Sequence, residues 1–196
     1  MKVILINGSG GSGKDTVVEL TTTYLRDKYQ VRNTSTIDEV KNIARTMGWD
    51  YNKDEKGRQF LADLKNAWTK YNNGANMKIY KDILEWEGYE TILPKEIVLF
   101  VHVREPESIQ WFIDNITECG IPICSLIVKR ENIAEFFNDA DQNVEKFDYD
   151  ITLINHGTLE DLEFICEDLA EIIDKWALEK KWFIAWGEEQ WQIWRL

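Results

Sequence analysis

The chain has 196 residues and a formal net charge of −12, from 35 acidic and 23 basic residues. The length fits one domain with a buried core. The negative charge argues against nucleic acids and anionic membranes as partners, because both would be repelled. An anionic small ligand would therefore have to be held by a local basic pocket.

The first predicted strand covers residues 2–7 and begins almost at the N-terminus. We therefore expect no signal peptide, and no apolar stretch of the sequence is long enough to span a bilayer. These features predict a cytoplasmic protein whose partners are small molecules.

A glycine-rich loop follows this strand and leads into a helical pattern. Residues 7–16 read Asn-Gly-Ser-Gly-Gly-Ser-Gly-Lys-Asp-Thr, which contains the phosphate-binding motif G-x-x-x-x-G-K (the P-loop). Glycines let the backbone wrap closely around an anion, and the helix N-terminus adds a positive dipole. The predicted phosphate ligands are Gly8, Gly10, Gly11, Ser12, Gly13, Lys14, Asp15 and Thr16. The alternative is a glycine-rich turn that binds nothing.

Four more short apolar runs predict buried strands at residues 31–36, 97–103, 122–128 and 149–154. Helical patterns lie between them, and alternating strands and helices indicate a parallel sheet covered on both faces. In such sheets ligands bind beyond the carboxyl ends of the strands. Thr158 is a suitable N-cap for the last of these helices, residues 158–178. The three cysteines lie in apolar runs and predict buried thiols: Cys119, Cys124 and Cys166.

The segment 38–93 is long for a single crossover and contains several helical stretches, which indicates a small inserted lobe. One of them, residues 54–73, has helical spacing of its apolar residues, with one face formed by Phe60, Leu61, Leu64, Ala67, Trp68 and Tyr71.

Three stretches carry a family resemblance. The P-loop has its hydroxyl residue, Thr16, two places after Lys14, and Asp15 stands where Ser or Thr is usual. Residues 101–106 resemble a strand ending Asp-Val-Arg-x-Pro, and residues 149–160 resemble a last strand with its Asn-x-Gly-Thr-Leu turn. In these features the chain resembles the adenylate-kinase-like nucleotide kinases, most of all the phage-type deoxynucleoside monophosphate kinases and more distantly dephospho-coenzyme A kinase.

The resemblance implies a P-loop NTPase three-layer α/β fold, with a five-stranded parallel sheet in the order 2-3-1-4-5 and helices on both faces. It implies a kinase domain over residues 1–180, an acceptor-binding lobe at 38–93 and a short lid at 129–145. Residues 181–196 remain as a tryptophan-rich tail.

The implied activity transfers the γ-phosphoryl group of ATP, with Mg²⁺, to a (deoxy)nucleoside monophosphate. The residues expected to act on the transferred group are Lys14, Asp15, Arg104 and Arg130. Asn155 and Gly157 would contact adenine, and Asp15 and Thr16 would organise the metal. Acceptor binding is assigned to Asp38, Lys41, Arg58 and Lys65, with Arg45 also on a polar helix face.

Several alternatives stay open. His102 replaces the acidic residue usual at its strand end, and a histidine there is often structural. Arg104 could pair with a neighbouring carboxylate, and Lys129 with Arg130 could be a solvated pair. The tail, which holds Trp176, Trp182, Trp186, Trp191 and Trp194, could dock on the chain itself or form a homodimer. The function could also be a kinase of another metabolite phosphate, such as dephospho-coenzyme A, or a non-catalytic ATP-binding switch.

Overall fold

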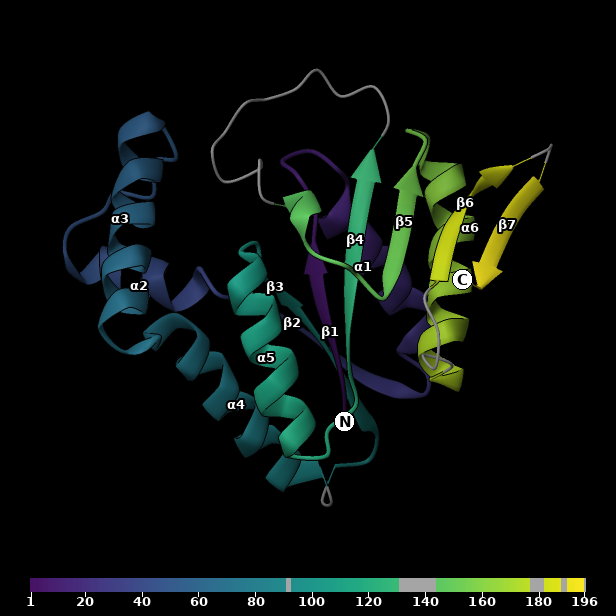
Figure 1. Ribbon diagram of the computed structural model, residues 1–196, viewed down its shortest axis with the longest axis horizontal. Helices are drawn as coiled ribbons and strands as arrows, with labels where there is room; N and C mark the ends of the chain where they lie inside the picture. The colour runs from purple at the N-terminus through teal and green to yellow at the C-terminus, as the bar shows by residue number, and fades with distance from the viewer. Residues whose placement is uncertain (91–92, 131–143, 177–181, 188–189, 196) are drawn as a thin grey trace. The chain divides into compact units, whose positions relative to one another are not determined.

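The computed structural model describes residues 1–90, 93–130, 144–176, 182–187 and 190–195. The chain forms two units (Figure 1). The first combines Met1–Asn33 with Pro94–Leu196, and the second is Thr34–Leu93. Each unit is described by itself below.

The first unit is built on a sheet whose central strands are almost wholly apolar and buried. Its first five strands are β1 Lys2–Asn7, β2 Tyr29–Ser35, β3 Glu96–His102, β4 Ile123–Arg130 and β5 Ile151–Asn155. β1 pairs in parallel with both β3 and β4, and β4 pairs in parallel with β5. The order β2-β3-β1-β4-β5 confirms the predicted P-loop fold class.

Two further strands extend this sheet beyond the five predicted. β6 Trp182–Gly187 lies parallel to β5, with Ile151 opposite Trp182, and β7 Gln190–Arg195 pairs antiparallel with β6. The described sheet therefore has seven strands and continues into the tryptophan-rich tail. Sequence reasoning placed no strand there.

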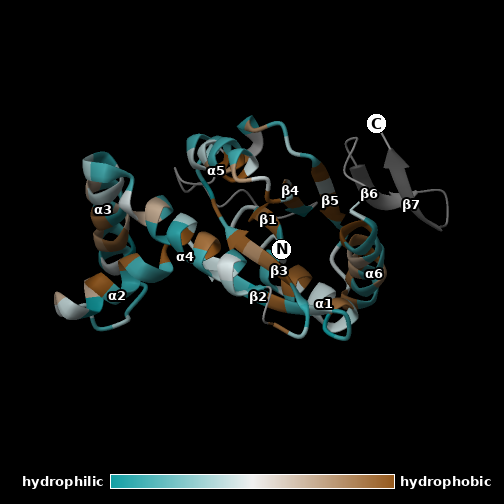
Figure 2. Ribbon diagram, turned by 90° about the horizontal axis from the view of Figure 1, so that it is seen from below, coloured by the Kyte–Doolittle hydropathy of each residue, from teal (hydrophilic) through white to brown (hydrophobic). Residues whose placement is uncertain are grey.

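Helices cover both faces of the sheet. α1 Lys14–Leu25 and α6 Leu159–Lys175 pack on one face, and α5 Pro106–Glu118 lies on the other (Figures 1 and 2). Hydrophobic residues concentrate on the strands, and α6 alternates between hydrophobic and hydrophilic residues (Figure 2). Its N-cap is Thr158, as predicted, whose hydroxyl accepts a hydrogen bond of 3.1 Å from Asp161 N.

A buried lysine joins the start of the sheet to the end of α6. Lys2 is 8% exposed, and its Nζ donates to Tyr29 Oη at 3.0 Å, to the Ile173 carbonyl at 3.1 Å and to the Asp174 carbonyl at 3.2 Å. The last carbonyls of a helix have no intrahelical partner, so the ammonium satisfies them and complements the negative end of the helix dipole.

The second unit contains three helices, α2 Asp38–Thr46, α3 Glu55–Asn72 and α4 Gly74–Glu90. Its core is formed by Val40, Ala44, Leu61 and Ala75, with Phe60, Leu64 and Trp68 packed against it. Two residues of the predicted apolar face do not take part. Ala67 is exposed and Tyr71 is 84% exposed, although Trp68 between them packs against the core.

One cysteine prediction was wrong. Cys124 and Cys166 are buried, but Cys119 is exposed, because it follows the last turn of α5, where the chain leaves the sheet face. In the described part of the chain, no helix is both long and apolar enough to cross a membrane.

Candidate functional site

The P-loop connects β1 to α1 with a backbone that only glycine adopts easily. Gly13, the N-cap of α1, has φ 93° and provides no side-chain cap. The first helical hydrogen bond runs from Val17 N to the Gly13 carbonyl at 2.9 Å. The backbone N–H groups of Asp15 and Thr16 therefore have no acceptor within the helix, which is the arrangement that binds anions.

At two positions of the loop, neighbouring atoms lie so close to the backbone that only glycine fits. A Cβ atom on Gly8 would lie 2.5 Å from Ser12 Oγ and 2.6 Å from the Val128 carbonyl. A Cβ atom on Gly13 would lie 2.5 Å from Asn155 Nδ2. The loop is thus packed tightly against the ends of β4 and β5, and it could not accept larger residues at these two positions.

Ser12 provides a test of whether the loop suits a phosphate. The residue is fully buried, and its Oγ has no hydrogen-bond partner among the residues that the structure describes. A buried hydroxyl without a partner is costly, and a phosphate oxygen in the loop would satisfy it. The residues present therefore fit a phosphate group.

The start of the loop is braced by a buried hydrogen-bond network around Asn7. Its Oδ1 accepts from Gly8 N at 2.8 Å, and its Nδ2 donates to the Arg104 carbonyl at 3.0 Å and to Tyr149 Oη at 2.7 Å. Tyr149 Oη in turn donates to the Val144 carbonyl at 2.8 Å. The network joins the ends of β1 and β3 to the segment that precedes β5.

The far side of the loop is held by Asn155 at the end of β5. Asn155 is 4% exposed, its Nδ2 donates to the Ser12 carbonyl at 2.9 Å, and its Oδ1 accepts from Gly157 N at 2.9 Å. Both polar groups of the amide are thus engaged within the chain. The geometry makes Asn155 a positioning residue for the loop, and the adenine contact expected of Asn155 and Gly157 remains a prediction.

Arg130, the last residue of β4, lies across the loop. Its Nη1 donates to the Gly11 carbonyl at 3.4 Å, and a Cβ atom on Gly157 would lie 3.6 Å from its Nη2. The structure therefore brings Arg130, Gly11 and Gly157 together. Arg130 is exposed, so its guanidinium could turn toward a bound phosphate.

Asp15 and His102 face one another at the start of α1. His102 Nδ1 lies 3.6 Å from Asp15 Oδ1, and the Asp15 side chain is 79% exposed. A carboxylate and the neighbouring Thr16 hydroxyl are hard oxygen donors of the kind that Mg²⁺ prefers. Arg104 is half-buried two residues after His102. No cluster of three or more metal-binding side chains occurs in the described parts of the chain.

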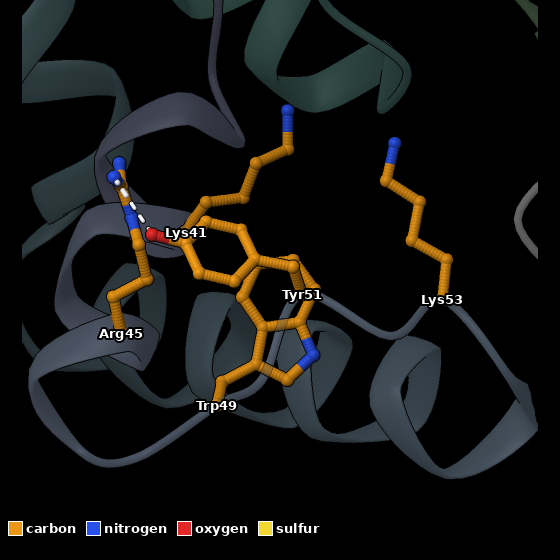
Figure 3. A pocket seen from close by; sticks show the side chains of 5 residues that line it. All are labelled: Lys41, Arg45, Trp49, Tyr51 and Lys53. Carbon is orange, nitrogen blue, oxygen red and sulfur yellow. Dashed lines mark hydrogen bonds between the residues drawn. The ribbon is translucent and has the colours of Figure 1, made fainter.

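Two of the cations considered for acceptor binding, Lys41 and Arg45, line a pocket in the second unit. Lys41 and Arg45 lie there with three residues that sequence reasoning missed: Trp49, Tyr51 and Lys53 (Figure 3). Asp38 contacts this group through an ion pair with Lys41 at 2.9 Å. Arg58 and Lys65 do not line the pocket. The two aromatic residues and the lysine within residues 49–53 were the available sequence signal.

The predicted lid, residues 129–145, lies mostly outside the described residues. Its first two residues end β4, and the 3₁₀ turn Val144–Lys146 begins at its other end. The proposed role of Lys129 and Arg130 in a lid remains a prediction.

No family model matches the chain, and neither does any curated protein. Similar solved structures include APS kinase CysC of Mycobacterium tuberculosis in complex with AMPPNP and APS, at 14% identity and a TM-score of 0.45, covering 90% of this chain and 97% of that one. Kti12 of Chaetomium thermophilum in complex with ADP-AlF3 has 14% identity and a TM-score of 0.46, with 88% and 97% covered. The tunicamycin resistance protein of Deinococcus radiodurans has 11% identity and a TM-score of 0.39, with 90% and 95% covered.

Proposed function

We propose that the chain is an ATP-dependent phosphotransferase whose acceptor is a small phosphorylated molecule, a (deoxy)nucleoside monophosphate. The observation that carries the proposal is the P-loop itself. It combines an uncapped helix N-terminus, glycines that close packing requires, and a buried Ser12 hydroxyl that lacks a partner within the described chain.

Different residues of the first unit would bind the phosphates, neutralise charge, hold the metal and position the loop. Backbone N–H groups of residues 10–16 and the Ser12 hydroxyl would hold the phosphates, while Lys14 and Arg130 would neutralise charge on the moving phosphoryl group. Asp15 and Thr16 would hold Mg²⁺, which would supply positive charge to offset that of the phosphates. Asn155 and the network around Asn7 would hold the loop rigid. Positioning and electrostatics supply most of the rate in such reactions.

The test is the Lys14→Ala variant. We expect it to lower phosphoryl transfer by at least about a hundredfold, because removing a preorganised charge from such a site costs that much. The assay measures transfer from labelled ATP to a panel of nucleoside monophosphates and to dephospho-coenzyme A. Lys28→Ala, in the same unit beyond the end of α1, is the matched control. A Lys14→Ala variant that keeps the wild-type rate contradicts the proposal.

A second candidate, a non-catalytic ATP-binding switch, is favoured by one observation. His102 occupies the strand end where the resembling kinases have an acidic residue, and it lies beside Asp15. The switch predicts that the wild-type chain binds ATP tightly and transfers phosphate to no acceptor. Measuring ATP affinity and turnover on the same preparation separates the two functions.

A further inference from the structure

β7 forms one edge of the sheet in the first unit. It pairs antiparallel with β6 along its whole length, from Gly187 opposite Gln190 to Trp182 opposite Arg195. Within the parts of the chain that the structure describes, no strand pairs with the other side of β7, so the sheet order ends there (Figure 1). An edge strand presents a row of backbone N–H and C=O groups to which another strand can bond.

β6 anchors this edge to the rest of the sheet. Ile151 and Leu153 of β5 lie opposite Trp182 and Ile184 of β6, in parallel register. An isolated two-stranded hairpin is at best marginally stable in water, whereas a hairpin that continues a larger sheet is supported by it. β7 is therefore presented as the outermost strand of a seven-stranded sheet.

β7 lacks the features that keep edge strands from pairing. Natural sheets protect their edges with lysine, proline, bulges or very short strands. The six residues of β7 pair one for one with β6, without a bulge, and their sequence Gln-Trp-Gln-Ile-Trp-Arg has neither lysine nor proline. Its one charged residue, Arg195, is the last. The strand at the opposite edge, β2, has Arg32 at its centre. β7 is therefore the better suited of the two edges for binding another strand.

The distribution of charge favours self-association through this part of the chain. Residues 175–196 contain four basic and three acidic residues, a net charge of +1. Since the whole chain carries −12, the other 174 residues carry −13. Two copies that met through surfaces formed by those residues would bring like charges together, whereas a meeting through β7 avoids this repulsion.

Symmetry restricts how β7 can pair with itself. A strand that meets its own copy about a two-fold axis in one sheet runs antiparallel to it, and the axis stands perpendicular to the sheet. Both copies then keep the same face upward. Because successive residues of a strand alternate between the two faces, each residue lies opposite one of its own face. The axis must therefore pass beside a residue and not between two residues.

Only one of the three central positions of β7 makes its sequence complementary to itself. With the axis at Gln192, Trp191 lies opposite Ile193 of the second copy, and Glu189, one place before β7 in the sequence, comes next to Arg195. The acidic and basic pair occurs twice, once at each end of the interface. An axis at Trp191 or Ile193 places no acidic residue opposite Arg195. Pairs of opposite charge and aromatic pairs with β-branched residues both stabilise neighbouring strands.

We propose that two copies of this chain associate through β7, paired antiparallel about a two-fold axis at Gln192, so that their sheets join into one continuous sheet. The interaction goes beyond the proposed function, because β4, β5 and β6 separate β7 from β1, the strand that leads into the P-loop. If the edge instead receives a strand of another protein, the purified chain stays monomeric.

The experiment is analytical ultracentrifugation of the full-length protein over a series of concentrations, in which we expect a monomer–dimer equilibrium. Arg195→Glu and Glu189→Arg each bring like charges together at both ends of the interface, so each should raise the dimer dissociation constant by at least about tenfold. Lys56→Glu makes the same change in charge as Arg195→Glu at an exposed position of α3 and should leave the constant unchanged. A protein that stays monomeric up to about 1 mM, or hairpin variants that dimerise as wild type does, overturns the proposal.

Exchange of charge separates a lost interface from a lost fold. In an equimolar mixture of Arg195→Glu and Glu189→Arg, every pair of residues 189 and 195 has opposite signs. The mixture should therefore form heterodimers at a concentration where neither variant dimerises alone, and the double variant should dimerise as wild type does. A mixture that stays monomeric overturns the proposed pairing.

A cysteine at the axis tests the register directly. Gln192→Cys, combined with Cys119→Ser, places two copies of residue 192 about 5 Å apart between Cα atoms, which is within the range of a disulfide. Oxidation with copper–phenanthroline should link them. Gln190→Cys in the same background is the matched control, because residue 190 lies about 13 Å along the strand from its own counterpart. Linking that is equally efficient at both positions, or absent at residue 192, overturns the proposal.

Discussion

The side-chain amide of Asn155 donates a 2.9 Å hydrogen bond to the backbone carbonyl of Ser12, 143 residues earlier in the chain. Through this bond the end of β5 holds the P-loop, and the same amide accepts from Gly157 N on its other side. The shape of the phosphate site therefore depends on the last of the five strands that the sequence predicted.

Asn155→Ala tests this dependence. The substitution leaves the Ser12 carbonyl and Gly157 N–H without their buried partner, which should destabilise the protein by about 1–3 kcal/mol. ATP affinity should fall by about tenfold, because the loop is no longer held in place. Thermal unfolding and calorimetric ATP titration measure the two effects.

A matched control for this prediction is Asn115→Ala. Within the described residues, the Asn115 amide bonds its own helix, donating to the Trp111 carbonyl at 2.7 Å. ATP affinity should be unchanged in this variant. Asn155→Asp gives a sharper comparison, since it keeps an acceptor for Gly157 N but places a carboxylate oxygen against the Ser12 carbonyl. If Asn155→Asp binds ATP as wild type does, the positioning role of Asn155 is wrong.

Lys2→Met should lower stability without altering nucleotide affinity. The substitution removes the three hydrogen bonds that the buried ammonium makes to Tyr29, Ile173 and Asp174. The carbonyls at the end of α6 would lose a buried donor, at a cost of about 1–3 kcal/mol. Urea unfolding measures the loss. Lys175→Met, which breaks only an exposed pair with Glu171, should change stability by less than about 0.5 kcal/mol. Equal effects of the two variants would contradict a structural role for Lys2.

The Asp174 carboxylate should make stability depend on pH in the acidic range. The hydrogen bond from Lys28 and that from Tyr29 lower the pKa of Asp174 below its ordinary value of 3.8. A lowered native pKa means that this contribution is complete above the unfolded pKa and disappears as pH falls through the native one. The stability difference between wild type and Asp174→Asn should therefore be constant near neutral pH and shrink below about pH 4. Unfolding midpoints across this range test it, and Lys28→Gln should remove most of the pH-dependent difference.

The three cysteines should differ sharply in reactivity toward a thiol reagent. Burial raises the pKa of the Cys166 thiol to about 12 and raises that of Cys124 as well, so neither forms thiolate readily at neutral pH. Cys119 is exposed. One equivalent of Ellman's reagent should react quickly with the native protein, and the other two only after unfolding. Cys119→Ser should abolish the fast phase, and fast reaction in that variant would contradict the burial of the other two.

Local patterns in the sequence predicted the elements that local forces form. The apolar run before residue 7, the glycines at 8–13 and the apolar spacing of the following helix predicted β1, the P-loop and α1. Thr158 predicted the start of α6, because a hydroxyl at an N-cap needs only the next turn of its own helix. The alternation of strands and helices predicted the parallel sheet, and the resemblance supplied its order.

Tertiary structure decided which side chains meet. The spacing of residues did not reveal that the amide of Asn155 is engaged with Ser12, that Arg130 reaches Gly11, or that Tyr51 stands at a left-handed backbone beside Trp49 and Arg45. Such contacts depend on crossovers that bring distant strand ends together and on the packing around one loop, neither of which has a local signature. The sequence by itself therefore determined the phosphate loop, since its conformation follows from nearby glycines and a helix N-terminus. Only the folded chain determined which distant side chains hold that loop.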